Sequence, residues 1–439
     1  MKKIIITSLL ALIVTSGFSQ NFNTKRLDSL FQILEINNKF MGSIAISENG
    51  KTIYTKSIGF DDLASSKKST SNTKYRIGSI SKMFTASMIF KAVEEKKINL
   101  SQTIDKYFPT VKNANKITIS NLLNHRSGIH DFTNDPEYLN WHTEPQSRIK
   151  MTERIAAGNI VFEPDTKGQY SNSNYILLTF ILEDVYKKSY SEILNQKIVK
   201  PLKLKNTYLG GKISLENNES NSYTLSGKWE KEKETDMSIP LGAGAIVSNP
   251  TDLNIFIENL FAGKIVSAEN LNLMKTIKDK FGMGILEFPY FERKSYGHTG
   301  GIDGFRSILS YFPNEKLALA ITSNGAMGYD NNNILLCALS SYFNKPFQMP
   351  SFSNVEITAV TLDSYLGTYG SSQIPIKINI TKKESTLIAQ ATGQPSFPLE
   401  PTASNVFKFD PAGVVIEFNA EKKELILKQG GKDYVFLKE

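Results

Sequence analysis

The chain has 439 residues and a mass of 49.1 kDa, which is enough for two or three domains. Its residues are 40% hydrophobic and 21% charged, a composition that excludes a disordered, collagen-like or multi-span membrane protein. The formal net charge of +8 is spread in short groups such as Lys67-Lys68, so no nucleic-acid partner is expected. One cysteine excludes an intrachain disulfide and a cysteine-rich zinc site, and four histidines disfavour a three-histidine metal site. We therefore predict chemistry without a metal or cofactor.

The first 19 residues have the pattern of a secretory signal peptide. Lys2 and Lys3 form a charged start, residues 4–14 form a mostly apolar run, and residues 17–19 supply a small-x-small cleavage site. The apolar run is shorter than the roughly 20 residues that a membrane anchor needs. The sequence predicts export to the periplasm or beyond the cell, with no integral membrane segment after cleavage.

The next 330 or so residues contain both helical and strand patterns, which predicts an α+β fold. Residues 21–60 begin with an amphipathic helix and continue as a β-hairpin; helical patterns then start at Ser79 and Ser120 and dominate to about residue 260. Two short apolar strands follow at 307–312 and 317–322, and then a helix at about 332–343. Strands at both ends of a helical middle predict one antiparallel sheet, built from the two ends of a domain, with helices packed against it.

The C-terminal part has a different pattern. Residues 346–354 look like a linker, and short alternating runs follow at 376–380, 406–409, 414–418, 425–427 and 434–437. Their close spacing predicts an all-β module of about 80 residues, which contains no histidine or cysteine and so is not expected to carry catalysis. The expected organisation is a signal peptide at 1–19, a main domain at 20–348 and a β-domain at 355–439.

Ser79-Ile-Ser-Lys82 matches the S-x-x-K pattern, in which a serine at a helix start and a lysine one turn later face the same cleft. The pattern is weak alone, because it also occurs at Ser65, Ser71 and Ser147. Ser79 differs in context: it opens an apolar-periodic helix whose N-terminal N–H groups could stabilise an oxyanion. A desolvated Lys82 could then take the serine proton. The alternative is a serine N-cap followed by a surface lysine.

Two further motifs favour a catalytic interpretation. In Tyr170-Ser-Asn172, the tyrosine and the asparagine can point into one cavity, one as a proton relay and one as a hydrogen-bond donor. His298-Thr299-Gly300-Gly301 is expected at a sheet edge, where missing side chains let a substrate backbone approach the N–H of Gly301. Each motif alone is typical of a turn, but the order S-x-x-K, Y-x-N, H-T-G in one chain is hard to obtain by accident.

With these motifs the sequence resembles the serine β-lactamase-related proteins of the class C β-lactamase, D-alanyl-D-alanine carboxypeptidase and D-aminopeptidase type. The resemblance runs from about residue 25 to 345 and includes the segments that start at Tyr75, Leu122, Tyr170, Pro201, Gly242 and Gly297. It implies an antiparallel sheet flanked by helices with an all-helical region, the β-lactamase/transpeptidase-like fold. The C-terminal module, with Tyr365-Leu-Gly-Thr-Tyr369, is similar to the small lipocalin-like β-barrel appended to such hydrolases.

The resemblance also implies roles for these residues. Ser79 would be the acylated nucleophile, with Lys82 and Tyr170 as the base and acid that move its proton. Asn172 would hold Lys82 and the substrate amide, and the backbone N–H groups of Ser79 and Gly301 would form the oxyanion hole. His125 and Ser127 fall in another segment of the resemblance, which we interpret as a packed turn.

One residue departs from the pattern of many relatives. Most β-lactamases and many carboxypeptidases of this group have Lys-Thr-Gly where this chain has His298-Thr-Gly. An unperturbed histidine is mostly neutral at pH 7, so it should bind a free carboxylate more weakly than a lysine does. This substitution makes the chain similar to the esterase and D-aminopeptidase members and disfavours antibiotic hydrolysis.

The sequence therefore predicts an exported serine hydrolase that forms an acyl-enzyme on Ser79 and acts on a small peptide, amide or ester. A peptidase of the D-alanyl-D-alanine carboxypeptidase type or a D-amino-acid amidase is favoured, with an esterase or a β-lactamase as alternatives. A non-catalytic binding or sensor protein that retains the pocket is the alternative from another class. The oligomeric state stays open.

Overall fold

The computed structural model describes residues 22–226, 228–326, 329–350, 352, 355, 357–383, 385–394, 396–409 and 412–439. The expected signal peptide at residues 1–19 lies outside the described residues. The boundaries of the main domain and the β-domain stay predictions. Across the described ranges, no helix combines the length and the apolar character needed to cross a membrane.

A central antiparallel sheet joins the two ends of the main domain. Its strand order is β10–β11–β12–β13–β1–β2, with β1 paired to β13 at Ile44↔Ile321. The strands are β1 (Phe40–Glu48), β2 (Lys51–Ile58), β10 (Leu286–Tyr290), β11 (Arg293–Ile302), β12 (Phe305–Phe312) and β13 (Leu317–Ala326). The sheet predicted from the strands at both ends of the domain is confirmed.

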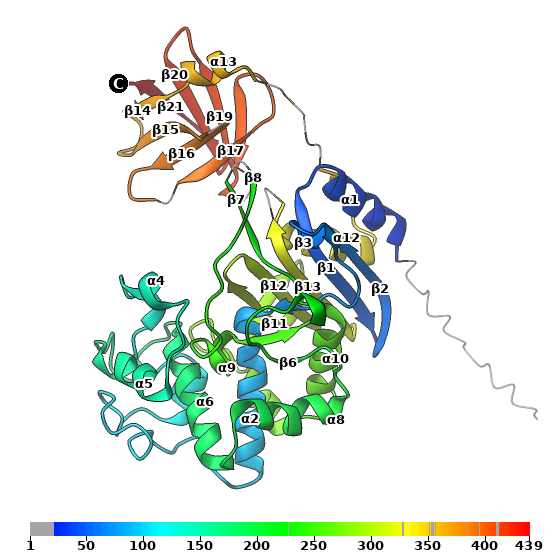
Figure 1. The fold of residues 1–439 in the computed structure, drawn as a ribbon, viewed down its shortest axis with the longest axis vertical. Coiled ribbons are helices and arrows are strands. Elements are labelled where there is room, and N and C mark those ends of the chain that lie inside the picture. The colour runs from blue at the N-terminus through cyan, green and yellow to red at the C-terminus, as the bar shows by residue number, and fades with distance from the viewer. Residues whose placement is uncertain are drawn as a thin grey trace, which may run out of the picture.

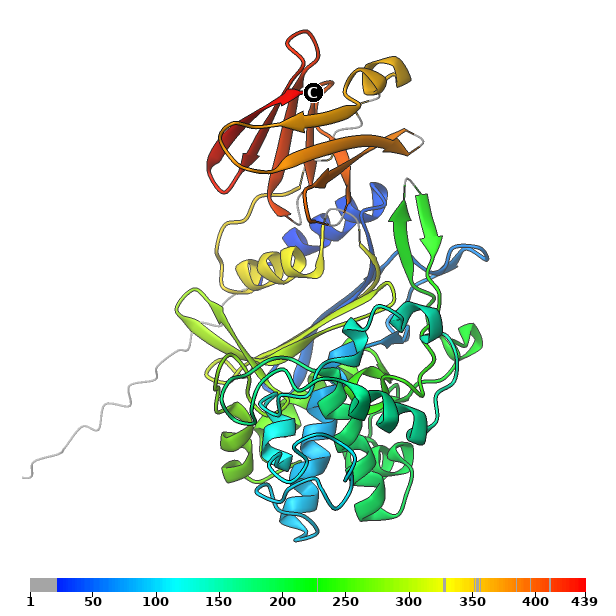
Figure 2. The same ribbon diagram turned by 90° about the vertical axis from the view of Figure 1, so that its left-hand side faces the viewer.

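Helices cover both faces of this sheet (Figure 2). On one face, α1 (Thr24–Ile36) and α12 (Asn331–Tyr342) bury apolar side chains at helical spacing against the sheet. On the other face, α2 (Ser81–Glu94), α6 (Asn172–Tyr186) and α10 (Pro250–Phe261) share one hydrophobic core with β12 and β13. The sheet is therefore a buried middle layer.

Shorter elements surround the long helices of the second face. The helical ones are α3 (Ile119–Leu123), α4 (Tyr138–Trp141), α5 (Arg148–Ala157), α7 (Tyr190–Leu194), α8 (Lys200–Leu202), α9 (Leu241–Gly244) and α11 (Ala268–Lys275), with single turns η1 (Gly78–Ile80), η2 (Phe132–Asn134), η3 (Asn195–Val199) and η4 (Leu215–Asn217). Three short strands precede Ser79: β3 (Phe60–Asp62), β4 (Lys67–Lys68) and β5 (Tyr75–Arg76). Four more interrupt the region that we expected to be mainly helical: β6 (Tyr208–Leu209), β7 (Tyr223–Ser226), β8 (Lys228–Lys231) and β9 (Ile246–Ser248).

The C-terminal strands form a closed antiparallel barrel in chain order, preceded by α13 (Ala359–Ser364) (Figure 1). The strands are β14 (Gly367–Gly370), β15 (Lys377–Lys383), β16 (Thr386–Ala391), β17 (Phe397–Pro401), β18 (Val406–Phe409), β19 (Val414–Asn419), β20 (Glu424–Gln429) and β21 (Lys432–Lys438). Alternate side chains fill the interior, as Val414, Ile416 and Phe418 show in β19. The expected β-barrel is confirmed.

Among the residues that the structure describes, two ion pairs join the barrel to the main domain. Lys39, just before β1, pairs with Glu400 of β17, and both side chains are mostly buried. Lys383 of β15 lies 3.9 Å from Glu230 of β8. The β7–β8 hairpin thus extends from the main domain toward the barrel (Figure 1).

Candidate active site

Ser79 lies in the single turn η1, between β5 and α2. The turn is sharp because Gly78 adopts a left-handed φ of 52°, and a Cβ there would lie 2.6 Å from the backbone nitrogen of Gly301. Glycine at this position therefore lets β11 approach the residue that precedes the serine. The helix expected from Ser79 begins at Ser81, with Ser79 in the turn before it.

The three residues predicted to act on the serine proton come together. Lys82 Nζ lies 3.0 Å from Ser79 Oγ, and the hydroxyl of Tyr170 donates to Ser79 Oγ at 2.7 Å. Lys82 is placed by the first turn of α2, and Tyr170 stands two residues before α6. Two segments far apart in the sequence thus meet at one hydroxyl oxygen.

Lys82 is fully buried and has only oxygen neighbours among its hydrogen-bond partners. Besides Ser79 Oγ, its Nζ donates to Asn172 Oδ1 at 2.7 Å and to the carbonyl oxygen of Ala243 at 2.8 Å. Burial lowers the pKa of Lys82 to about 7, although the negative charge of Asp131 opposes the shift. Near neutral pH, Lys82 therefore exists as a mixture of amine and ammonium.

The pKa of Tyr170 is shifted in the opposite direction from that of Lys82. Burial raises the pKa of Tyr170 above its usual value of 10, and the hydrogen bond to Ser79 opposes this only in part. Tyr170 therefore keeps its proton at neutral pH and is a donor rather than a base.

Asn172 connects Lys82 to a carboxylate. Its Oδ1 accepts from Lys82, and its Nδ2 donates to Asp131 Oδ2 at 2.9 Å. Asp131 in turn accepts from the backbone N–H and hydroxyl of Thr133. These hydrogen bonds fix the orientation of the Asn172 amide. They also place the negative charge of Asp131 close to Lys82, with only Asn172 between the two side chains.

The H-T-G segment lies in β11 beside the serine. β10 pairs with residues 293–297 of β11, so residues 298–302 are left with a free edge, which faces η1. The expectation of an edge is therefore correct for this segment, although β11 as a whole lies between β10 and β12. Gly301 lines the same cleft as Ser79, which places its backbone near the serine.

The other residues of this segment have different surroundings. His298 is only 3% exposed, and its Nδ1–H donates to the carbonyl oxygen of Thr299. Burial and the nearby Lys82 lower the pKa of His298 to about 3, so the ring is neutral. Gly300 packs against Ile77 and Ser307, and the side chain of Thr299 is exposed.

The substrate-sized space at Ser79 is a cleft of about 710 Å³. Its apolar wall comes from η2, α4 and the segment before α9, and its opposite rim comes from β8 and the chain that follows it. The residues of the apolar wall are Phe132, Tyr138, Leu139, Ile239 and Pro240, and the charged residues of the rim are Glu230, Lys231, Glu232 and Lys233. The cleft therefore offers apolar contact on one side and both signs of charge on the other.

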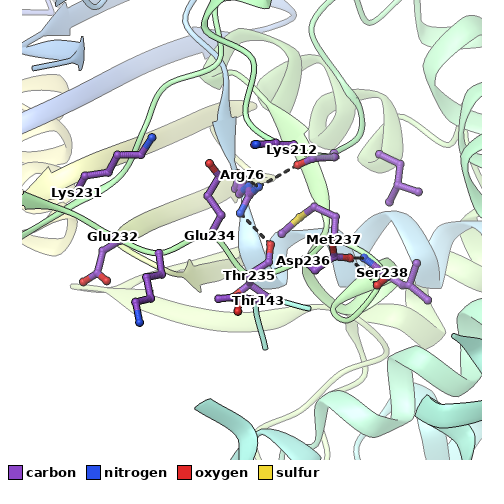
Figure 3. Close-up of a pocket in the computed structure, with 15 residues that line it drawn as sticks. Arg76, Thr143, Lys212, Lys231, Glu232, Glu234, Thr235, Asp236, Met237 and Ser238 are labelled. Atoms are coloured by element: carbon purple, nitrogen blue, oxygen red, sulfur yellow. Dashed lines mark hydrogen bonds and ion pairs between the residues drawn. The ribbon is translucent and has the colours of Figure 1, made fainter. Parts of the chain in front are cut away.

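A second pocket of about 810 Å³ lies along the same rim, around Arg76 (Figure 3). Arg76 forms ion pairs with Glu234 at 3.1 Å and with Asp303 at 2.9 Å, and donates to the carbonyl oxygen of Thr235. Asp303 also accepts from the N–H of Thr235. These contacts tie the cleft rim to the β11–β12 turn, and neither Ser79 nor its two partners line this pocket.

His125 and Ser127 lie behind the reacting groups. His125 is 3% exposed and its ring stacks on that of Tyr170, with centroids 4.4 Å apart. Ser127 is buried and donates to Asn174 Oδ1. The segment packs as expected, and it also contacts a residue of the candidate site.

The sequence motifs did not reveal two partners of Lys82. Asp131 reaches it through Asn172, and Ala243 offers a backbone carbonyl. The segment Gly242-Ala243-Gly244 belongs to the family resemblance, so the sequence marked Ala243 as part of a motif. Nothing in the spacing linked Ala243 to Lys82. In the described ranges, no group of three or more His, Cys, Asp or Glu side chains is arranged to hold a metal ion.

Comparisons with known proteins show which family this chain belongs to. The chain is 27% identical to the teichoic acid D-alanine hydrolase of Staphylococcus aureus (strain MRSA252) over 307 residues, which cover 68% of this chain and 73% of the relative. The solved D-amino acid amidase from Ochrobactrum anthropi SV3 is 25% identical, with a TM-score of 0.60, over 72% of this chain and 97% of that chain.

A third protein is similar over nearly the whole chain. The octameric penicillin-binding protein homologue from Pyrococcus abyssi covers 94% of this chain and 99% of its own, with a TM-score of 0.65 and 24% identity, and shows the fold. Residues 38–335 match the β-lactamase family. Because this match spans most of the chain and includes Ser79, Lys82 and Tyr170, the chain belongs to the β-lactamase family and is a serine hydrolase.

Proposed function

We propose that this protein hydrolyses D-aminoacyl amide or ester bonds through an acyl-enzyme on Ser79. The observation that carries the proposal is the placement of Ser79 Oγ, 3.0 Å from Lys82 Nζ and 2.7 Å from the Tyr170 hydroxyl. A nucleophile within hydrogen-bonding distance of both a base and an acid has the arrangement that acyl transfer needs.

Lys82 is the base of the first step. As an amine it has two hydrogens and one lone pair, and two of its three neighbours, Asn172 Oδ1 and the Ala243 carbonyl oxygen, can only accept hydrogen bonds. The hydrogens go to these two acceptors, so the lone pair faces Ser79 Oγ. With a pKa of about 7, roughly half of Lys82 is in this form at pH 7.

Tyr170 is the acid that releases the leaving group. As Ser79 Oγ bonds to the substrate carbonyl carbon, its proton moves to Lys82. The bond from that carbon to the leaving nitrogen or oxygen then breaks, and the leaving atom takes the proton of Tyr170. The ammonium of Lys82 then returns a proton to Tyr170; Lys82 Nζ and the Tyr170 hydroxyl both lie within hydrogen-bonding distance of Ser79 Oγ.

Deacylation uses the same groups in reverse order. A water in the place of the leaving group gives its proton to Tyr170 while Tyr170 gives its own to Lys82. The hydroxide oxygen bonds to the acyl carbon, the bond to Ser79 Oγ breaks, and Lys82 returns the proton to that oxygen. The backbone N–H groups of Ser79 and Gly301 are the proposed donors to the negative oxygen in both steps.

The substrate class rests on the environment of the cleft and on the relatives. The neutral, buried His298 offers no cation for a free carboxylate, in contrast to the lysine of a Lys-Thr-Gly segment. This supports amide and ester substrates over a carboxypeptidase reaction. The relatives named as a D-amino acid amidase and a teichoic acid D-alanine hydrolase support the D-configuration.

The test combines turnover with trapping of the intermediate. D-alanyl and D-phenylalanyl amides and esters are compared with their L-forms, with D-alanyl-D-alanine peptides and with a penicillin, and intact mass is measured after exposure to a fluorophosphonate. We expect turnover of the D-amides or D-esters and one adduct on Ser79, both lost in Ser79→Ala.

The matched control is Ser71→Ala, because Ser71 heads another S-x-x-K spacing but is exposed. It should keep both turnover and the adduct. A folded wild-type protein that neither turns over these compounds nor forms an adduct would favour a binding protein that retains the pocket.

We also propose that the chain is exported. The charged start, the apolar run and the small residues at 17–19 support cleavage after Ser19. N-terminal sequencing of the protein from the cell envelope and the medium should find Gln20 as the first residue; an intact Met1 there would contradict the proposal.

A further inference from the structure

His125 contacts three consecutive residues around the tyrosine of the site. Its carbonyl oxygen accepts the N–H of Gln169 at 2.9 Å, and its Nδ1 accepts the N–H of Ser171 at 3.2 Å. Between these two bonds, its ring lies on that of Tyr170, with centroids 4.4 Å apart and planes 29° from parallel. One residue therefore fixes the backbone on both sides of Tyr170 and supports the ring itself.

The backbone of His125 has an uncommon conformation. Its φ of 58° is in the left-handed region, which residues other than glycine seldom adopt. The residue follows the end of α3, and the chain after it runs beside the segment that leads to Tyr170, with the carbonyl oxygen of Arg126 accepting from Asp165 and that of Gly128 from Val161. Such a conformation persists where surrounding contacts hold it, and these contacts all lead to the tyrosine segment.

The hydrogen bonds define the form of the imidazole. Nδ1 accepts from the Ser171 N–H and lies 3.4 Å from Asn174 Nδ2, so its proton must be on Nε2. Asn174 Oδ1 accepts from Ser127 at 2.6 Å, which turns the amide nitrogen toward His125. Burial holds the pKa of His125 well below its usual value, in agreement with a neutral ring.

The contacts around His125 leave Tyr170 little freedom. Phe281 lies 5.1 Å from the His125 ring and 6.2 Å from the Tyr170 ring, and His298 lies 6.3 Å from the latter. His125 does not line the cleft at Ser79. It therefore acts on the reaction through Tyr170, not through the substrate.

We propose that His125 is a positioning residue, which holds Tyr170 so that the phenol hydroxyl reaches Ser79 Oγ at 2.7 Å. This inference rests on the proposed function, because it assigns Tyr170 the role of the acid. A displacement of this hydroxyl by about 1 Å would break a short hydrogen bond on which proton transfer depends. The packed turn at residues 125–128 thus contributes to catalysis by positioning Tyr170.

Two substitutions separate the contacts of His125. His125→Phe keeps a ring against Tyr170 but leaves the Ser171 N–H without its acceptor, and His125→Asn keeps an acceptor in a residue that tolerates the left-handed backbone but removes the ring. We expect each to lower kcat for a D-alanyl ester or amide by about tenfold or more, with KM changed by less than about threefold. The rate of fluorophosphonate labelling of Ser79 should fall in parallel.

The decisive measurement repeats both substitutions in a Tyr170→Phe background. If His125 acts through the tyrosine hydroxyl, neither should reduce the remaining rate by more than about twofold there, because the effects of coupled residues do not add. A general structural role predicts full additional losses in that background. Equal losses in both backgrounds, or no loss in the folded single variants, would overturn the proposal.

The control is His130→Ala, which removes a second imidazole from the same loop. The His130 ring faces Asp135 at 3.5 Å and has no ring contact with Tyr170. It should keep kcat within about twofold of the wild type. A wild-type protein inert to both substrate and probe would overturn the proposed function and this inference together, whereas a reactive wild type with unaffected His125 variants would overturn the positioning role alone.

Discussion

Lys82 is buried where a permanent charge would be costly. Its ammonium and amine forms make different hydrogen bonds with its three oxygen neighbours. The ammonium donates to all three neighbours, while the amine leaves its lone pair for Ser79 Oγ. A lysine in water would be protonated almost completely at pH 7 and could not act in this way. Burial is therefore what makes the residue a base.

The pH dependence of activity should follow Lys82. Because the amine is the active form and the pKa of Lys82 is about 7, kcat/KM should rise with pH through a midpoint near 7 and fall about tenfold per unit below it. Lys82→Arg, which stays charged, should lower kcat by about 10²- to 10⁴-fold. A profile that is flat from pH 5 to 9 would exclude Lys82 as the base.

Asp131 should set the position of that profile. Its carboxylate raises the pKa of Lys82 against the effect of burial, so its removal should lower that pKa further. In Asp131→Asn, the acid limb of kcat/KM should therefore move to lower pH. The amide can still accept from Asn172, so a loss of activity without a shift of the limb would mean that Asp131 acts through geometry rather than charge.

At the scale of the elements, the contact between β11 and the turn before α2 places the serine. Gly300 of β11 lies against the carbonyl oxygen of Ile77, and Ser307 of β12 donates to the same oxygen at 2.8 Å. This oxygen precedes Ser79 by two residues. The position of the nucleophile relative to the strand is therefore fixed by close backbone packing at Gly300 and by the Ser307 hydroxyl.

A methyl group at Gly300 should disturb this contact. In Gly300→Ala the new Cβ would overlap with Ile77 O and Ser307 Oγ, which should cost about 1–3 kcal/mol of unfolding free energy and lower kcat at least about tenfold. In Gly301→Ala the nearest atom to the new Cβ is 3.6 Å away, so stability should change by no more than about 0.5 kcal/mol. Thermal unfolding and kinetics of both variants test this; equal stability would contradict it.

The sequence predicted the elements with a clear repeat and missed those without one. The apolar spacing in α1 and α12 and the alternation in β15 and β19 each bury one face, which is why pattern alone identified them. Strands of two or three residues, such as β6 and β9, are too short to show a period. Their pairing depends on the tertiary structure around them.

The site shows the same division. Ser79, Lys82, Tyr170 and Asn172 lie in short motifs, so the sequence named them, and the structure brings them within hydrogen-bonding distance. The link between Asp131 and Asn172 joins residues 41 positions apart with no repeat between them. The burial of His298 depends on the register of β11 against β12, where it lies opposite Leu309, and no local pattern sets that register.

At the scale of the whole molecule, the Lys39–Glu400 pair joins the barrel to the main domain, and both of its side chains are mostly buried. Lys39 also lies 5.1 Å from the ring of Phe352, in the segment between the two domains. Removal of Glu400 takes this mostly buried ion pair away from Lys39.

Glu400→Ala should therefore lower the free energy of unfolding by about 1–3 kcal/mol, between the values for exposed and fully buried pairs. Its control is Glu417→Ala, because Glu417 pairs with Lys428 on the exposed surface of the barrel. That variant should lose less than about 1 kcal/mol. Thermal unfolding followed by circular dichroism measures both, and equal losses would show that the Lys39–Glu400 pair contributes no more than a surface pair.

The strand order of the central sheet also affects how the chain is made. β1 pairs with β13, so the N-terminal strand has no partner on that side until residue 326 has left the ribosome. At a synthesis rate of about 5–20 residues per second, β1 waits for roughly a quarter of a minute to a minute. During this time the central sheet lacks the β1–β13 pairing that joins its two ends, and a chain in that unfinished state can thread through a narrow translocation channel of the kind that the proposed export needs.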